Sequence, residues 1–275
     1  MTIHSRAVDA RSILTKAAGF AGTGAYTHTL NPYAGCAFAC RYCYMRTFPG
    51  QRYREEPWGT WVDVKANAAD VYRREARALK RRDRPLRIFM SSGTDPYQPL
   101  ERTARVTRGL LEAMLEDPPE RITVQTRSPF VLEDIDLLAA LRLRARVRVS
   151  MTVETDRDDI RRLFAPTAPS MPQRLGALER LHAAGIETQA AVSPLLPCTK
   201  GFPALLAGKV DRVVLDTLRI GDGAGGRRSA ALGMPALFRR HRLMAWYAPD
   251  LHVRAARWFA RTLPPGTVHT MAGDF

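Results

Sequence analysis

Residues 31–49 read Asn-Pro-Tyr-Ala-Gly-Cys-Ala-Phe-Ala-Cys-Arg-Tyr-Cys-Tyr-Met-Arg-Thr-Phe-Pro, and this stretch decides how the rest of the sequence is interpreted. Three of the four cysteines of the chain lie in it, at Cys36, Cys40 and Cys43. Four cysteines are a poor basis for a disulfide framework in 275 residues, but three of them so close together suit a metal site in a reducing compartment. We therefore interpret the three clustered cysteines as metal ligands.

The spacing CxxxCxxC favours an iron–sulfur cluster at this metal site. Three thiolates at this spacing can fold around one 4Fe-4S cubane and ligate three of its four irons. The fourth iron then has no protein ligand, so it can bind a substrate or cofactor directly, as open catalytic metal sites do.

A zinc site is the alternative interpretation of the same cysteines. Structural zinc takes four ligands and would normally show a second ligand pair nearby. Only His28 or the distant Cys198 could complete such a site. The flanking aromatic residues Phe38, Tyr42 and Tyr44 are side chains that a cluster and an adenine ring would need around them. We therefore place the cluster ahead of zinc.

Outside this stretch, short apolar runs alternate with longer amphipathic ones, which is typical of parallel βα units. The predicted strands are residues 27–31, 87–91, 122–126, 147–152, 188–193 and 212–216. The predicted helices are residues 64–82, 107–116, 132–143, 158–164 and 172–184. Six strands are too few to close an eight-stranded barrel, so we expect an α/β fold that forms a partial (β/α)6 barrel. Its chemistry should lie in the loops after the strands.

Three segments follow from this pattern. Residues 1–25 lack periodicity and are expected to be an N-terminal extension that wraps the barrel or stays partly mobile. Residues 26–220 form the barrel. Residues 221–275 begin with the flexible loop Gly-Asp-Gly-Ala-Gly-Gly and continue as a helical segment packed on the barrel. The chain has no run of eighteen apolar residues and no signal peptide, so we expect a soluble cytoplasmic protein without membrane contact.

The composition is strongly basic and rich in arginine. The net charge is +15, and 37 of the 42 basic residues are arginine. Such a chain attracts polyanions, and arginine is the better phosphate ligand, so a nucleic-acid substrate or partner is one interpretation. A solvated basic surface that reflects only genome composition is the other.

CxxxCxxC with an aromatic residue before the third cysteine is the signature of the radical S-adenosylmethionine (SAM) superfamily, which this chain resembles. Residues 31–36, 40–44 and 92–99 resemble its spore photoproduct lyase-like branch, and the resemblance spans residues 31–216. It implies a radical-SAM partial barrel with a 4Fe-4S cluster and SAM as cofactors. It also implies a reductant such as flavodoxin or ferredoxin, and cleavage of SAM to methionine and a 5′-deoxyadenosyl radical that abstracts a substrate hydrogen.

The resemblance also implies SAM-binding positions. Thr94 and Asp95 match the residues that hold SAM after the second strand, and Ser150 matches a SAM contact on the fourth. Arg127 occupies the place of a SAM-contacting lysine, and its planar guanidinium replaces a point charge. Tyr42 would line the adenine site. Ordinary turn or core packing is the alternative for Thr94, Ser150 and Tyr42.

Two further residues are candidates for catalysis. Tyr44 resembles a tyrosine that relays the hydrogen atom. The branch carries a radical-quenching cysteine where this chain has Ser92, whose O–H bond is too strong to donate a hydrogen atom. Cys198 is the spare thiol, and either it donates hydrogen to a substrate radical or it is a small buried loop residue.

The leading functional hypothesis is a radical SAM enzyme on a large anionic substrate, with damaged DNA or another nucleic acid first, as in a DNA-repair lyase. A peptide or a small metabolite is the second substrate class. A non-catalytic, zinc-containing nucleic-acid binder is the alternative from a different class. The sequence leaves the oligomeric state open.

Overall fold

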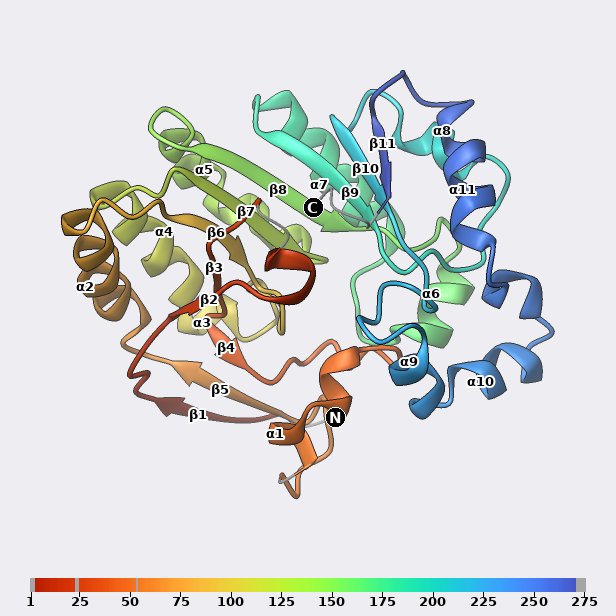
Figure 1. The fold of residues 1–275 in the computed structure, drawn as a ribbon, viewed down its shortest axis with the longest axis horizontal. Helices are drawn as coiled ribbons and strands as arrows, with labels where there is room; N and C mark the ends of the chain where they lie inside the picture. Colours follow the sequence, from red (N-terminus) through yellow and green to blue (C-terminus); the bar gives the residue numbers. More distant parts are fainter. Residues whose placement is uncertain (1–2, 23–24, 53, 271–275) are drawn as a thin grey trace.

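The chain folds around one curved, mostly parallel sheet (Figure 1). This computed structural model describes residues 3–22, 25–52 and 54–270. The sheet has eight described strands, in the spatial order β11-β10-β9-β8-β7-β6-β3-β2. All neighbours pair in parallel except β2, which is antiparallel to β3. The strands are β2 (Leu14–Lys16), β3 (His28–Leu30), β6 (Arg87–Met90), β7 (Arg121–Thr126), β8 (Arg146–Thr152), β9 (Glu187–Val192), β10 (Arg212–Leu215) and β11 (Val268–Thr270).

Because β2 and β11 are the two edges of this sheet, the described strands form an open, partial barrel, as the sequence predicts. The six predicted strands are confirmed as β3, β6, β7, β8, β9 and β10, with small differences at their ends. Their near-continuous apolar runs are buried on both faces of the sheet. Helices cover its outer face, and the side chains of its curved inner face pack against one another.

The covering layer consists of the crossover helices between these strands (Figure 1). They are α2 (Ala68–Arg81), α3 (Glu101–Ala104), α4 (Val106–Glu116), α5 (Ile135–Leu141), α6 (Asp158–Phe164), α7 (Met171–Ala183) and α8 (Phe202–Leu206). The remaining helices are α1 (Pro49–Arg52), α9 (Arg227–Ala231), α10 (Met234–Arg240) and α11 (Leu251–Ala260). Short 3-10 turns are η1 (Gly19–Gly22), η2 (Tyr44–Thr47), η3 (Pro129–Asp134) and η4 (Met244–Tyr247).

The predicted helix 64–82 is wrong at its start. Trp61–Lys65 is a strand, β5, and the helix α2 begins only at Ala68. The apolar residues before Asn67 alternate with polar ones and include two valines, a pattern typical of a strand. The predicted helix 132–143 is also shorter, because its first turn is the 3-10 segment η3.

Both ends of the chain contribute strands that the sequence did not predict. In the N-terminal extension, β1 (His4–Val8) pairs with β5, and β2 extends the main sheet, so this extension wraps the barrel. At the other end, β11 adds a parallel strand beside β10 after the helical segment. Within the described residues, the helices fall short of the length and apolarity that a membrane span requires.

A second, three-stranded sheet carries the start of the cysteine stretch. Its strands lie in the order β1-β5-β4, where β4 is Tyr33–Ala34. Immediately after β4, Gly35 has φ +80°, and a Cβ there would lie 2.4 Å from the carbonyl oxygen of Trp61. Only glycine allows this close approach at a positive φ. The small sheet therefore fixes where the cysteine-bearing loop begins.

Gly35→Ala is expected to destabilise the protein by roughly 2–4 kcal/mol, because the new methyl group meets Trp61 and the backbone conformation is strained. Chemical denaturation under anaerobic conditions measures this free energy of unfolding. The matched control is Gly50→Ala, since a Cβ at Gly50 has open space around it, and its effect should stay within about 0.5 kcal/mol. Equal effects of the two substitutions would contradict the proposed steric role.

Candidate active site

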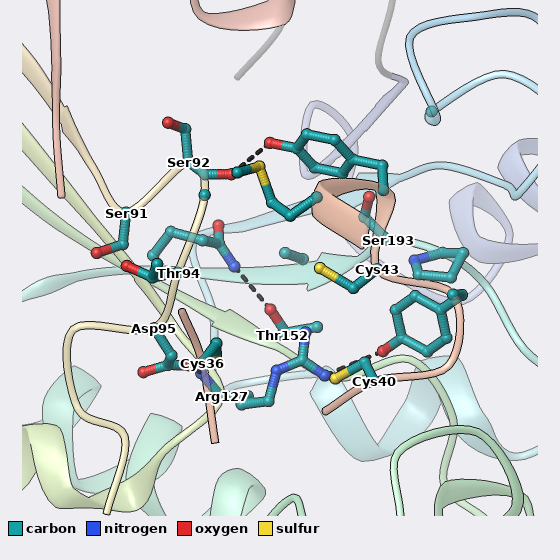
Figure 2. A pocket seen from close by; sticks show the side chains of 18 of the residues that line it. Cys36, Cys40, Cys43, Ser91, Ser92, Thr94, Asp95, Arg127, Thr152 and Ser193 are labelled. Carbon is teal, nitrogen blue, oxygen red and sulfur yellow. Dashed lines mark hydrogen bonds between the residues drawn. The ribbon is translucent and has the colours of Figure 1, made fainter. Parts of the chain in front are cut away.

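One cavity lies at the carboxyl ends of the barrel strands, between them and the cysteine loop (Figure 2). Including the part that opens to solvent, its free space is about 1100 Å³. Polar residues that follow consecutive strands line it, as the fold predicts. They are Ser91 to Asp95 after β6, Thr126 and Arg127 at the end of β7, Thr152 at the end of β8, Ser193 after β9, and Asp216 and Thr217 after β10.

The three predicted ligands Cys36, Cys40 and Cys43 all line this cavity as free thiols. Burial raises the pKa of each thiol, that of Cys43 to about 12, so a metal would have to displace the protons. No three His, Cys, Asp or Glu side chains in the described part of the chain converge on one metal ion. A cubane spreads its three thiolates over three irons, so this donor set fits a cluster better than zinc.

Neither sequence candidate for a fourth zinc ligand lies with these thiols. The Nδ1 atom of His28 lies 2.9 Å from the hydroxyl of Thr27. Cys198 is buried in the main core, where the charges that act on it are those of Asp156 and Arg157. Both residues lie outside the set that lines the cavity, so Cys198 is not brought to the reacting centre here. Its role as a hydrogen donor stays a prediction.

The cysteine loop is irregular and buried, so its backbone needs hydrogen-bond partners from elsewhere. Gln98, which is fully buried, accepts a hydrogen bond from the amide of Ala37 at 2.9 Å. The Thr167 hydroxyl donates to the carbonyl oxygen of Phe38 at 2.6 Å. The amide of Arg41 donates to a carbonyl of α6. Gln98 belongs to the second motif quoted above, and its role was missed because nothing local in sequence reveals a loop-to-loop contact.

The cysteine stretch and the motif of residues 92–99 meet at the end of β6. The Asn31 side-chain oxygen accepts a hydrogen bond from the amide of Gly93 at 2.9 Å. Tyr44 donates to the carbonyl oxygen of Ser92, so the candidate relay tyrosine lines the cavity beside the segment after β6. Ser91 has φ +73°, a conformation rare for a residue with a side chain, and this turns its hydroxyl toward the cavity.

Asp95 is placed at the cavity, but its carboxylate is already engaged. It accepts hydrogen bonds from the Thr126 hydroxyl at 2.7 Å, the Arg127 amide at 2.8 Å and the Tyr97 amide at 2.9 Å. These bonds tie the turn after β6 to the end of β7. Asp95 therefore holds this wall of the cavity in shape, and Thr94 beside it also lines the cavity.

Arg127 and Tyr42 meet at a buried carboxylate that the sequence did not single out. Arg127 donates to Glu154 at 2.6 Å and to the Tyr42 hydroxyl at 3.0 Å, and Tyr42 also donates to Glu154. Arg174 donates to the other oxygen of Glu154 at 2.6 Å. Burial alone would raise the pKa of Glu154, but the two guanidinium groups lower it to about 2. The paired charges fix the Tyr42 ring beside the cysteines.

Ser150 is the predicted SAM contact that the structure does not bring to the cavity. It is fully buried on β8, where its hydroxyl accepts a hydrogen bond from Gln189 at 2.8 Å. Thr152, two residues along the same face of the strand, lines the cavity instead. The role of Ser150 therefore stays a prediction.

Several polar atoms at the cavity lack a hydrogen-bond partner within the described residues, although they are buried. They are the hydroxyl oxygens of Ser91, Thr94 and Thr217 and the side-chain oxygen of Gln125. Buried polar atoms are normally paired, so such a group points to a bound polar ligand. Unpartnered polar atoms around three thiols fit a cluster together with further polar ligands in the same cavity.

The glycine-rich loop after β10 forms the part of the cavity wall that we call the far wall, which includes Gly221 and Asp222. Asp222 accepts hydrogen bonds from the amides of Ala224, Gly226 and Ser229 at 2.8, 2.9 and 2.9 Å, so the loop predicted to be flexible is folded around this carboxylate. The Arg228 guanidinium lies 4.9 Å from the Phe48 ring centroid, which links the loop to the cysteine side of the cavity.

Comparison with known proteins agrees with this geometry. The family model of the radical SAM superfamily matches residues 30–202, which is more than half of the chain. Enzymes of this superfamily use a 4Fe-4S cluster and SAM. An uncharacterized protein of Methanocaldococcus jannaschii is 32% identical over 170 residues, which cover 62% of this chain and 61% of that protein. One of Mycobacterium tuberculosis is 28% identical over 176 residues, 62% of this chain and 50% of that protein. The chain thus spans about half to three-fifths of these relatives.

Solved structures show the same fold at low sequence identity. A cysteine-to-serine mutant of spore photoproduct lyase has a TM-score of 0.59 at 13% identity, covering 97% of this chain and 81% of that one. A cysteine-to-alanine mutant with dinucleoside spore photoproduct has a TM-score of 0.55 at 17% identity, covering 77% and 60%.

Asp216→Asn should stabilise the protein at alkaline pH. Burial raises the pKa of the Asp216 carboxyl to about 7 from 3.8, and the charge of Asp222 adds to this. The raised pKa favours the protonated form in the folded state, so stability falls as pH rises from 4 to 7. At about pH 8.5 the variant should unfold with roughly 2–4 kcal/mol more free energy than the parent, and near pH 4.5 the two should converge.

Denaturant titrations at the two pH values measure this difference. The exposed Asp9→Asn is the control and should change stability by less than about 0.5 kcal/mol at both. A pH-independent effect of Asp216→Asn would refute the burial argument.

Proposed function

The chain belongs to the radical SAM superfamily, and on this premise we propose that it cleaves SAM at a cluster held by Cys36, Cys40 and Cys43 and acts on a substrate in the same cavity. The observation that carries the proposal is that three free thiols and several unpartnered polar atoms line one cavity at the strand ends. When bound, the reduced cluster supplies the electron that splits SAM into methionine and a 5′-deoxyadenosyl radical, which takes a hydrogen atom from the substrate.

The residues of the chain supply binding and orientation for this chemistry. Thr94 and Ser91 offer hydroxyls to the polar end of SAM, on the wall that Asp95 holds rigid. Tyr42, fixed by Glu154 and Arg127, forms the floor for the adenine ring. The ion pairs of Glu154 with Arg127 and Arg174 lie behind this side of the site, where the Arg174 and Glu154 side chains are 0% and 2% exposed.

Tyr44 is the proposed hydrogen relay. Its hydroxyl donates to the backbone of Ser92, at the position where the resembling branch carries a cysteine. The phenol therefore lies beside the place where a substrate radical would need a hydrogen atom, while Cys198 lies outside the cavity-lining residues.

For the substrate we propose a nucleic acid. The net charge of +15, nearly all from arginine, favours a polyanion. The fold likeness to a lyase that binds a dinucleoside photoproduct supports the same class. A DNA-repair reaction is the specific form of this proposal, and a peptide or a small metabolite is the alternative substrate class.

Cys43→Ala should abolish 5′-deoxyadenosine formation. The protein is reconstituted anaerobically with iron and sulfide and then incubated with SAM and dithionite. The parent should hold about four irons per chain, and the variant should hold fewer and make no 5′-deoxyadenosine above background. Cys198→Ala is the matched control and should keep both the iron and the product, because its thiol is not at the cavity.

Three results would contradict this assignment. They are a colourless, zinc-loaded parent, a parent that makes no 5′-deoxyadenosine, and a Cys198→Ala protein that loses the cluster. A changed substrate-derived product in Cys198→Ala, with the cluster intact, would instead establish the hydrogen-donor role of that thiol.

Nucleic-acid binding should weaken steeply with salt. If the basic surface contacts about five phosphates, the affinity of the holoprotein for single-stranded DNA should fall by roughly 100-fold or more between 50 and 200 mM salt. Fluorescence anisotropy at a series of salt concentrations measures the slope. A slope near zero would favour the peptide or small-metabolite substrate.

A further inference from the structure

From the far wall of the cavity we infer that Asp216 is a substrate-binding residue, whose carboxylate accepts a hydrogen bond from an uncharged N–H donor of the lactam or imide type. This inference rests on the proposed nucleic-acid substrate and names the part of it that enters the cavity. Among the bases, thymine, uracil and guanine carry a ring N–H beside a carbonyl, whereas adenine and cytosine carry a ring acceptor there.

Several contacts hold the Asp216 carboxylate in place at the cavity. The amide of Thr217 donates to one oxygen of Asp216 at 2.6 Å, and the Ser193 hydroxyl donates to the other at 3.2 Å. Gly221 leaves room for it, since a Cβ there would lie 1.3 Å from the second oxygen. Two chain segments, after β9 and after β10, thus converge to hold one acidic group at the cavity.

Among the three carboxylates that line this cavity, Asp216 accepts the fewest hydrogen bonds. Asp95 and Asp222 each accept three hydrogen bonds that close local turns. Asp216 accepts two from the described residues, and a carboxylate has about four acceptor positions. The charge of Asp216 is buried and only partly compensated by hydrogen bonds, so it raises the free energy of the folded protein. Functional groups commonly have this effect.

An independent observation also points to a ligand at this wall. Thr217 is 4% exposed and lines the cavity next to Asp216, and its buried hydroxyl has no partner among the described residues. The side-chain oxygen of Gln125 is unpartnered as well. An acceptor beside a hydroxyl that can donate matches an N–H beside a carbonyl, which is the pattern of a lactam edge.

The charge of the cavity excludes the alternative that a phosphate enters. Arg127 is the only basic residue among the described residues that line it, and that guanidinium is committed to Glu154. Asp95, Asp216 and Asp222 line the same space. A phosphate there would face carboxylates in a low-dielectric site, so the phosphates must stay on the basic exterior while a neutral base enters.

The inference is tested by oligonucleotide binding without reductant, which separates it from radical chemistry. The probes are fluorescent single-stranded DNAs of about eight thymidines and the same sequence built from N3-methylthymidine, which lacks the N–H but keeps every phosphate. At about pH 8, above the pKa of about 7 of Asp216, the SAM-loaded holoprotein should bind the unmethylated strand about tenfold more tightly.

Asp216→Asn should reduce this preference to within about twofold, because the amide nitrogen replaces the oxygen that accepts from Ser193 and that would accept from the ligand, while the other oxygen still accepts from Thr217. Thr217→Val, which removes the unpartnered hydroxyl, should lower the affinity for both strands alike. Asp9→Asn, at an exposed carboxylate, should behave like the parent. SAM affinity, measured by equilibrium dialysis, should stay unchanged in Asp216→Asn.

Three outcomes would overturn the inference: a parent that binds both strands equally or not at all, an Asp216→Asn protein that keeps the full preference, or one that loses about tenfold in SAM affinity and so assigns the carboxyl to the cofactor. The proposed radical function fails separately, through the absence of 5′-deoxyadenosine from the parent. Each failure therefore has its own measurement.

Discussion

The structure depends on satisfying the backbone of one buried, irregular loop. The cysteine loop forms neither a helix nor a strand, and irregular backbone away from water is expensive unless every polar group finds a partner. Gln98, Thr167 and the carbonyl of Phe164 supply those partners from two crossover segments of the barrel. Hydrogen bonds from the barrel thus stabilise a loop that would be unstable without them.

The second constraint is that the charges buried beside this loop must be neutralised. It follows from the first because the loop and its partners lie away from water. Glu154 is 1% exposed and would be destabilising by itself, so two arginines must accompany it. Arg127 comes from β7 and Arg174 from α7, which means that the ion pairs also join two neighbouring βα units. Because Arg127 bonds to Tyr42 as well, the orientation of a cysteine-loop aromatic is coupled to the packing of a helix on the far side of the sheet.

The sequence predicts the parts whose signal is local. Apolar runs between helical patterns give the six barrel strands, and the cysteine spacing gives the ligands, because each pattern is complete within a few residues. It misses β1 and β11, which are short and stabilised by pairing with strands far along the chain, and it reads the alternating residues of β5 as a helix start. The hydrogen-bond partners of Gln98 and Asp216 cannot be predicted for the same reason, since each contact joins segments that are far apart in the sequence.

The contrast between an arginine-rich chain and an acid-lined cavity has a physical consequence for substrate selection. Long-range attraction depends on the net charge and brings any polyanion to the surface, so it cannot discriminate among sequences or lesions. Inside the cavity, a carboxylate such as Asp216 acts only over hydrogen-bond distance and penalises any group that presents a lone pair or a negative charge. The affinity for polyanions is therefore set by the surface, and the selection among chemical groups is set by the cavity. On the proposed function, this division would let the chain bind nucleic acid broadly and still admit few groups to the neighbourhood of its cysteines.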